Sequence, residues 1–298
     1  MKKISYIVLI VFAHISCESP NTHTLSTNFH ERNNIISQGA FSLKSEDGVN
    51  SIMNLNNMIC VENSNISPVF DFYEKTGEYV GGIGIIGHGK NEFIMPHIFS
   101  GINDTIMVVD NSQKKIFSFY DNMACNKKNF YVNCCVNEVR TIHWPYIGYY
   151  HLTKDGIIWN IYNVSNKEIV ETLTFNGGEA YLETFSWSSF ENYIVFAYQY
   201  HNKIRICKIS SNMKIVDDKI LQDDTLIPHE SRCYYTDIVC GKDYFILLSQ
   251  KSVDGSTLSG VSKIQLYNYD GKPLKEFILD GIQYCFSYIK TPTNLFIL

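Results

Sequence analysis

Residues 69–119 read VFDFYEKTGEYVGGIGIIGHGKNEFIMPHIFSGINDTIMVVDNSQKKIFSF, and this stretch decides the fold. Short apolar runs, such as Val69–Tyr73, Thr105–Val109 and Ile116–Tyr120, alternate with polar turns. The runs are rich in β-branched and aromatic residues with a period of two, which is typical of strands. The turns carry Gly, Asn and Asp, which tolerate the positive φ angles of tight hairpins. The stretch therefore predicts antiparallel strands joined by hairpins.

The same unit of strands and turns recurs along the rest of the chain. Five units are visible, at residues 51–86, 96–132, 139–175, 182–221 and 233–279, and a sixth begins at 282–290 and 294–298. Four short strands repeated every 40 to 50 residues or so are typical of propeller blades. The pattern predicts an all-β fold: a six-bladed β-propeller of four-stranded antiparallel blades. Because a ring must close, we expect the last blade to combine both ends of the chain, using Gly39–Lys44 with a contribution from Thr24–Phe29.

Residues 69–119 also resemble a known family. The similarity covers Val69–Gly84, Gly87–Phe93, Pro96, Asp104–Asp110 and Lys115–Phe119. These segments are similar to the NHL-type or TolB-like six-bladed propellers, which are common as lipoproteins in Bacteroidetes. The resemblance implies a propeller fold and an envelope location, whereas propellers as a class have many unrelated functions. At Lys90-Asn91 the family usually has Pro-Gly, so we expect a looser turn between the first two blades.

Three residues of this stretch have predicted structural roles. Phe93 is expected to fill the joint between adjacent blades. Pro96 is expected to begin an inner strand, where no amide donor is needed. Asp110 is expected to accept hydrogen bonds from the turn that follows it.

The N-terminus has the layout of a secretory signal, which we place at residues 1–16. Lys2 and Lys3 precede a largely apolar run that is too short to span a membrane as a helix. Cys17 stands where a bacterial lipoprotein signal has its acylated cysteine, although His14 replaces the usual aliphatic residue. Residues 17–34 are polar and predict a flexible, lipid-anchored tether, and residues 35–298 are predicted to form the propeller domain. The expected location is the cell envelope, on the outer membrane or its periplasmic face; cleavage after residue 13 would instead release a soluble periplasmic protein.

Eight cysteines remain after Cys17, at positions 60, 125, 134, 135, 207, 233, 240 and 285. Export permits disulfides, and the neighbourhood of Cys125 and Cys134-Cys135 is the expected place for one. Cys60 and Cys207 lie in apolar runs, where a thiol acts as a small hydrophobic group. Adjacent cysteines lack the gap that lets two thiolates reach one zinc ion.

The chain has no recognisable catalytic motif. Gly81–Gly89 is rich in glycine, but no helix pattern follows it, so we interpret it as a turn. No nucleophile elbow and no metal-binding histidine pair occur. The 25 Lys and Arg residues are scattered in a chain of net charge −5, which argues against nucleic acid as a partner. We assign no metal, cofactor or catalytic residue, although histidines at equivalent blade positions could converge at one mouth of the ring.

Aromatic residues crowd the third to fifth units and are the candidate ligand-binding residues. Aromatic groups with polar tips are favoured where one side is dry and the other wet. The candidates are Trp144, Tyr149, Tyr150, His151, Tyr200, His201 and Tyr234. Packing between blades would use the same residue types, so that alternative stays open.

Two functions fit these observations. The first is an envelope-anchored binding or scaffold module, attached to the membrane by its lipid, for a glycan, a peptide or an envelope protein. The alternative is a propeller enzyme, a lyase or hydrolase with His, Tyr and acidic groups in the axial funnel. An enzyme requires several titratable groups within hydrogen-bond reach of one another, whereas a scaffold requires a broad aromatic surface.

Overall fold

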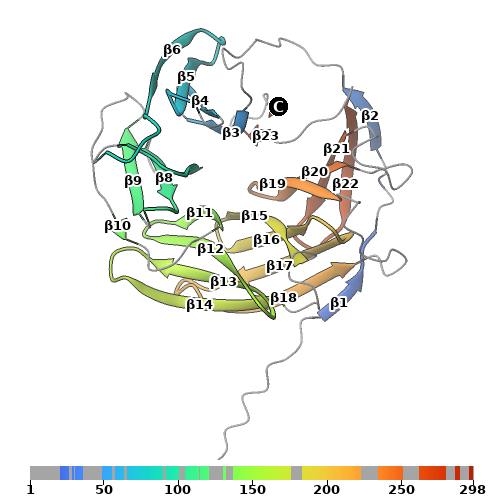
Figure 1. Cartoon of the computed structure of the whole chain (residues 1–298). Coiled ribbons are helices and arrows are strands. Elements are labelled where there is room, and N and C mark those ends of the chain that lie inside the picture. Colours follow the sequence, from blue (N-terminus) through green and yellow to red (C-terminus); the bar gives the residue numbers. More distant parts are fainter. Residues whose placement is uncertain are drawn as a thin grey trace, which may run out of the picture.

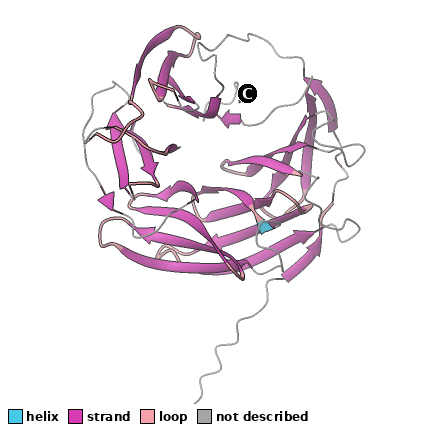
Figure 2. Ribbon diagram, viewed as in Figure 1, coloured by secondary structure: helices cyan, strands magenta, loops and turns pink. Residues whose placement is uncertain are grey.

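The described part of the chain is almost entirely β-strand, as Figure 2 shows. The computed structural model describes residues 21–26, 29, 31–35, 49–55, 58–63, 66–89, 92–100, 105–113, 115–120, 130–131, 137–175, 183–222, 234–250, 262–279, 286–288 and 295–297. Among these residues, no helix is long and apolar enough to cross a membrane. The predicted all-β class is confirmed.

Five antiparallel sheets follow one another along the chain, and each matches one predicted unit. Blade 1 holds β3 (Val49–Asn54), β4 (Met58–Asn63), β5 (Phe70–Glu74) and β6 (Tyr79–Ile83). Blade 2 holds β7 (Pro96–Ser100), β8 (Thr105–Asp110), β9 (Lys115–Tyr120) and β10 (Phe130–Tyr131). Blade 3 holds β11 (Asn137–His143), β12 (Tyr146–Thr153), β13 (Gly156–Asn163) and β14 (Glu168–Phe175). Blade 4 holds β15 (Phe185–Phe190), β16 (Tyr193–Tyr198), β17 (Lys203–Ile209) and β18 (Ile215–Gln222). Blade 5 holds β19 (Tyr235–Cys240), β20 (Tyr244–Gln250), β21 (Ser262–Asn268) and β22 (Pro273–Leu279).

The first strand of each blade lies on the inner side of a closed ring (Figure 1). These inner strands contact one another in the cyclic order β3, β7, β11, β15, β19, β23 and back to β3. β23 (Phe286–Tyr288) pairs with β24 (Leu295–Ile297), so the C-terminal hairpin occupies the sixth position, between blades 5 and 1. The six-bladed ring is therefore confirmed, while Gly39–Lys44, the expected N-terminal part of the sixth blade, lies outside the described residues.

The N-terminal segment lies on the outside of blades 4 and 5. β1 (Asn21–Thr24) pairs in parallel with β18, and β2 (Glu31–Ile35) pairs in parallel with β22. Between the two strands, the side chains of Leu25 and Phe29 are buried. We name residues 21–35 the strap.

The strap differs from two expectations. Part of the predicted flexible tether, residues 17–34, forms strands. Of the expected Thr24–Phe29 contribution to the last blade, Thr24, Leu25 and Phe29 lie at blades 4 and 5 instead. The physical reason is that an outer edge strand pairs through its backbone and needs no apolar alternation. A polar composition could therefore not distinguish this edge strand from a tether.

The structural roles predicted for blades 1 and 2 are confirmed. Phe93 is 3% exposed and packs between Phe70 of blade 1, with ring centroids 5.8 Å apart, and Ile106 of blade 2. Pro96 is the first residue of the inner strand β7. The buried Asp110 carboxylate accepts the Gln113 backbone N–H of the following turn at 3.2 Å, and also accepts two N–H groups from the turn before β7.

The joint between blades 3 and 4 is filled by indole rings. Trp159 and Trp187 are fully buried, and their rings meet edge to face at 5.3 Å. Gly148 makes this approach possible, because a Cβ atom there would lie 2.4 Å from Trp187 and 2.7 Å from Trp159. The aromatic residues of these units thus supply a large part of the core.

Three of the cysteines lie in the described residues. Cys60, Cys207 and Cys240 are buried free thiols, as predicted for the first two. Burial raises the pKa of each, and nearby carboxylates add to the effect at Cys60 and Cys207. Cys125 and Cys134-Cys135, the expected place for a disulfide, lie outside the described residues.

Candidate functional site

Polar side chains from three inner strands meet on the inner side of the ring. β11 supplies Glu138 and Arg140, β15 supplies Ser186, and β19 supplies Asp237. Because first strands of successive blades are neighbours, residues about 50 and 100 positions apart in sequence come together. We name these four residues the axial cluster.

Arg140 connects blade 3 to blade 5. Its Nη2 atom lies 3.2 Å from Oδ1 of Asp237 and 3.7 Å from Oε2 of Glu138. Its Nη1 atom donates to the Ile238 carbonyl at 3.2 Å. Burial opposes the guanidinium charge, but the two carboxylates raise the pKa of Arg140 above its ordinary value. The guanidinium is therefore a fixed cation whose side chain is still 29% exposed.

Glu138 has an unusual backbone and an incompletely paired side chain. Its φ angle is 44°, in the left-handed region, and the pairing of β11 with β12 is irregular at this point. Ser186 Oγ donates to Glu138 Oε1 at 3.1 Å, and Trp187 Nε1 donates to the Glu138 carbonyl at 2.7 Å. The other carboxylate oxygen, Oε2, is buried without a hydrogen bond in the described structure. Strained backbone and bulges of this kind concentrate at functional sites.

The charge state of Glu138 follows from this setting. Burial raises the pKa of its carboxyl, Asp237 adds to the rise, and Arg140 opposes it. The half-buried Tyr150 of β12 lies close enough that burial and the Glu138 charge raise the pKa of its phenol. A carboxyl group with a raised pKa can both donate and accept a proton, which suits hydrogen bonding to a ligand or acid–base chemistry.

The seven sequence-predicted residues separate into groups. Trp144, in the turn between β11 and β12, and Tyr149, which is 4% exposed, pack in the joint between blades 2 and 3. Tyr150 lies near the axial cluster, because the charges of Glu138 and Arg140 both affect the pKa of its phenol. It also contacts Phe185 of blade 4, with ring centroids 5.1 Å apart. His151 follows on the same strand and is half-buried.

The remaining predicted residues surround the turn between β16 and β17. His201 Nε2 lies 3.2 Å from Oε1 of the buried Glu183, and Lys203 donates to the other carboxylate oxygen at 3.1 Å. Although burial opposes ionisation, His201 and Lys203 hold the pKa of Glu183 below its ordinary value. Tyr200 lies half-buried in the same turn, and the backbone N–H of the buried Tyr234 donates to the turn at 2.7 Å.

The predicted residues therefore do not form one exposed aromatic surface. Tyr149 and Tyr234 are buried in joints between blades, which fits the packing alternative for those two. A ligand role for the seven stays a prediction, and Cys17 lies outside the described residues. Within the described ranges, no group of three or more His, Cys, Asp or Glu residues is arranged to hold a metal ion.

Sequence reasoning missed the axial cluster. Glu138 and Asp237 are isolated acids that belong to no motif, and 99 positions separate them in the printed sequence. In the first strands of the third, fourth and fifth units, Glu138 and Ser186 are the second residues and Asp237 is the third, so a comparison of these strands brings them within one position of one another. That alignment was the available signal.

Comparisons with known proteins agree with the fold. The model of the family DUF5128, a 6-bladed beta-propeller, matches residues 46–215. No curated protein sequence matches the chain significantly.

Three solved structures are similar to the chain. A Bacteroides fragilis protein inferred to be exported is 12% identical, with 91% of this chain and 85% of that chain covered and a TM-score of 0.53. A DUF4221 family member from Bacteroides vulgatus is 10% identical, with 85% and 88% covered and a TM-score of 0.54. Hsv2 of Kluyveromyces lactis is 13% identical, with 83% and 69% covered and a TM-score of 0.50. At these identities the similarity concerns the fold alone.

Proposed function

The chain belongs to the DUF5128 family of six-bladed β-propellers, and from this premise we propose that it is a binding module of the bacterial cell envelope. Its signal-like N-terminus and Cys17 support export and lipid anchoring. The inferred export of the structurally similar Bacteroides fragilis protein agrees with this location.

One observation carries the binding proposal: the axial cluster presents a partly exposed cation between two carboxylates, with the side chains of Arg140 and Glu138 29% and 30% exposed. A ligand that both donates and accepts hydrogen bonds at adjacent positions would pair with the carboxylates and with the guanidinium at the same time. Neighbouring hydroxyl groups of a sugar have that property, while an anionic ligand would be repelled by Glu138 and Asp237. The proposed ligand is therefore a neutral glycan, and the two acids and Arg140 are its polar contacts.

A binding array tests this proposal. The purified chain is applied to immobilised neutral oligosaccharides, with peptides on the same surface, and the affinity of each positive ligand is then measured in solution. Arg140→Lys keeps the charge but loses the geometry of the fork, so it should weaken glycan binding about tenfold or more. Arg205→Lys is the matched control, because Arg205 pairs with Asp218 near the outer side of blade 4.

The outcomes are distinct. Loss of glycan binding in Arg140→Lys with binding retained in Arg205→Lys supports the proposal. Binding to peptides only, or equal losses in the two variants, contradicts it.

The raised pKa of Glu138 next to Tyr150 favours a second candidate function, an acid–base enzyme acting on a polysaccharide. The test is incubation with polysaccharides that the array identifies, followed by detection of new reducing ends or unsaturated products. Product that disappears in Glu138→Gln would favour the enzyme; binding without product favours the module.

A further inference from the structure

The strap fixes the N-terminal end of the domain to the outer side of the ring. Asn21 is level with Lys219 in the parallel pairing of β1 with β18, and the Leu25 N–H donates to the Gln222 carbonyl at 2.9 Å. Phe29 then packs edge to face on Tyr267 of blade 5 at 5.4 Å. Two sheets and two buried side chains hold the strap, so it is part of the domain.

The position of Asn21 limits how far the ring can move from an anchor at Cys17. Asn21 is four positions after Cys17, and each extended step spans at most about 3.5 Å, so the reach is about 14 Å. A tether that continued to residue 34 would reach about 60 Å by the same rule. An anchor at Cys17 would therefore keep the outer side of blade 4 close to the bilayer surface.

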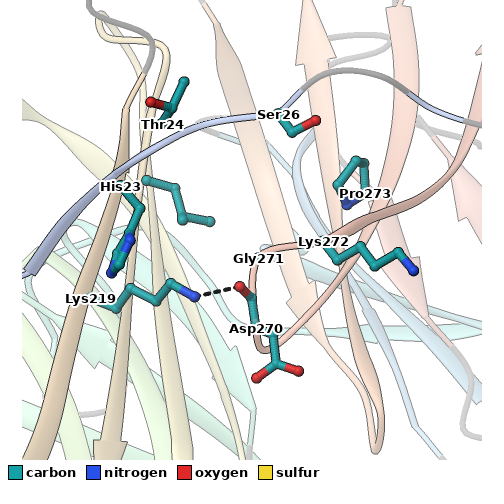
Figure 3. A pocket seen from close by; sticks show the side chains of 9 residues that line it. His23, Thr24, Ser26, Lys219, Asp270, Gly271, Lys272 and Pro273 are labelled. Carbon is teal, nitrogen blue, oxygen red and sulfur yellow. Dashed lines mark hydrogen bonds between the residues drawn. The ribbon is translucent and has the colours of Figure 1, made fainter.

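A pocket of about 430 Å³ lies beside the strap, between the outer parts of blades 4 and 5 (Figure 3). His23 and Thr24 of β1 line one side, Lys219 of β18 lies beneath them, and the turn from Asp270 to Lys272 forms the other side. Lys219 Nζ donates to the Asp270 carbonyl oxygen. The lining residues include Lys219, Lys272 and His23 but only Asp270 as an acid, so the lining has one excess positive charge when the histidine is neutral.

We propose that the outer side of blades 4 and 5 faces the membrane and that this pocket accepts the phosphate of an anionic lipid headgroup. The proposal rests on the lipid anchor in the proposed function, but it is independent of the glycan site. In this orientation the ring stands on its edge, and both ends of its axis are open to solvent. Each lysine near an anionic surface adds to the attraction between the domain and the membrane.

Fluorescence quenching in vesicles tests the orientation. The lipidated full chain is reconstituted in phosphatidylethanolamine and phosphatidylglycerol vesicles that carry a headgroup-attached quencher. A dye is placed by Val216→Cys in β18 of blade 4, where the side chain is 60% exposed, or by Ile85→Cys just after β6 of blade 1, where it is 59% exposed. Blades 1 and 4 are three positions apart in the ring and lie opposite each other. The unsubstituted chain, labelled in parallel, gives the background from native thiols. We expect quenching at position 216 to exceed that at 85 several-fold; equal or reversed quenching overturns the proposal.

A charge-reversal pair tests the headgroup contact. Lys219→Glu with Lys272→Glu should reduce the membrane-facing population, and therefore quenching at position 216, by roughly tenfold or more. Lys154→Glu with Lys167→Glu, two exposed lysines of blade 3, is the matched control and should leave the quenching unchanged. Equal effects of the two pairs on the quenching at position 216 overturn the lipid headgroup as the occupant of the pocket.

A chain that fails to float with the vesicles has no anchor, and this proposal falls. Glycan binding measured in solution would be unaffected by that result, so the two failures are distinguishable.

Discussion

Glu138→Gln should stabilise the protein while it weakens ligand binding. Burial raises the pKa of Glu138, so its charge is less favourable in the folded than in the unfolded state, at a cost on the order of 1 kcal/mol. Arg140, 3.7 Å away, offsets part of this cost. The amide keeps an oxygen that can accept the Ser186 hydroxyl and removes the charge. We therefore expect a gain of about 1 kcal/mol in the free energy of unfolding at pH 7.

The gain should depend on pH with a defined sign. The pKa of Glu138 is raised in the folded state. The contribution of this carboxyl to the free energy of unfolding is therefore fully present below the ordinary pKa of 4.5 and is lost as pH rises through the folded pKa. Glu138→Gln has no titrating carboxyl at this position, so its free energy of unfolding does not fall in this way. The two proteins should have similar stability near pH 4 and diverge toward pH 7.

Urea unfolding from pH 4 to pH 8, followed by circular dichroism, measures the effect. Glu62→Gln is the matched control, because the buried Glu62 carboxylate accepts the Ile98 N–H at 2.7 Å and pairs with His97. The free energy of unfolding of Glu62→Gln should be lower than that of the parent by about 1 kcal/mol or more. Parallel pH profiles for the parent and Glu138→Gln, or a loss in Glu138→Gln similar to that in Glu62→Gln, would refute the reasoning.

Three further predictions concern other parts of the fold. Phe29→Ala should lower the free energy of unfolding by about 2 to 4 kcal/mol in chemical denaturation, while the exposed Thr22→Ala changes it by less than about 0.5 kcal/mol; a neutral Phe29→Ala would mean that the strap is not docked. The hydrogen bond with Glu62 raises the pKa of His97, so NMR titration should give a His97 pKa above 6.5 in the parent and nearer 6.5 in Glu62→Gln. The stability that this pair contributes is fully present below pH 6.5 and is lost as pH rises through the folded pKa of His97. Gly148→Ala should cost about 1 to 3 kcal/mol by forcing two indole rings apart, and an unchanged melting temperature would contradict the packing.

The sequence predicts the blades well because the physical signal is local. Each blade contains strands whose alternate residues fill joints, and the predicted units 96–132 and 139–175 correspond closely to the blades that begin at Pro96 and Asn137. The roles of Phe93 and Asp110 could be predicted for the same reason, since both act within neighbouring turns and strands.

The strap and the axial cluster could not be predicted from local pattern. The strap pairs through its backbone, and only Leu25 and Phe29 mark it as part of the domain. The cluster depends on contacts between blades, so Arg140 and Asp237 become neighbours only after blades 3, 4 and 5 have packed together. The aromatic side chains were the predicted ligand-binding residues, but Tyr149 and Tyr234 are buried in joints between blades, which explains why aromatic residues stand at these two positions.

The most direct test of the axial site is a crystal structure of the chain with the glycan that binds most tightly in the array. We predict sugar oxygen atoms within hydrogen-bond distance of the Arg140 guanidinium and of the Glu138 or Asp237 carboxylate, on the inner strands of blades 3 to 5. A sugar bound at the outer side of the ring or at the turn around His201, with Arg140 and Glu138 uncontacted, would contradict the account.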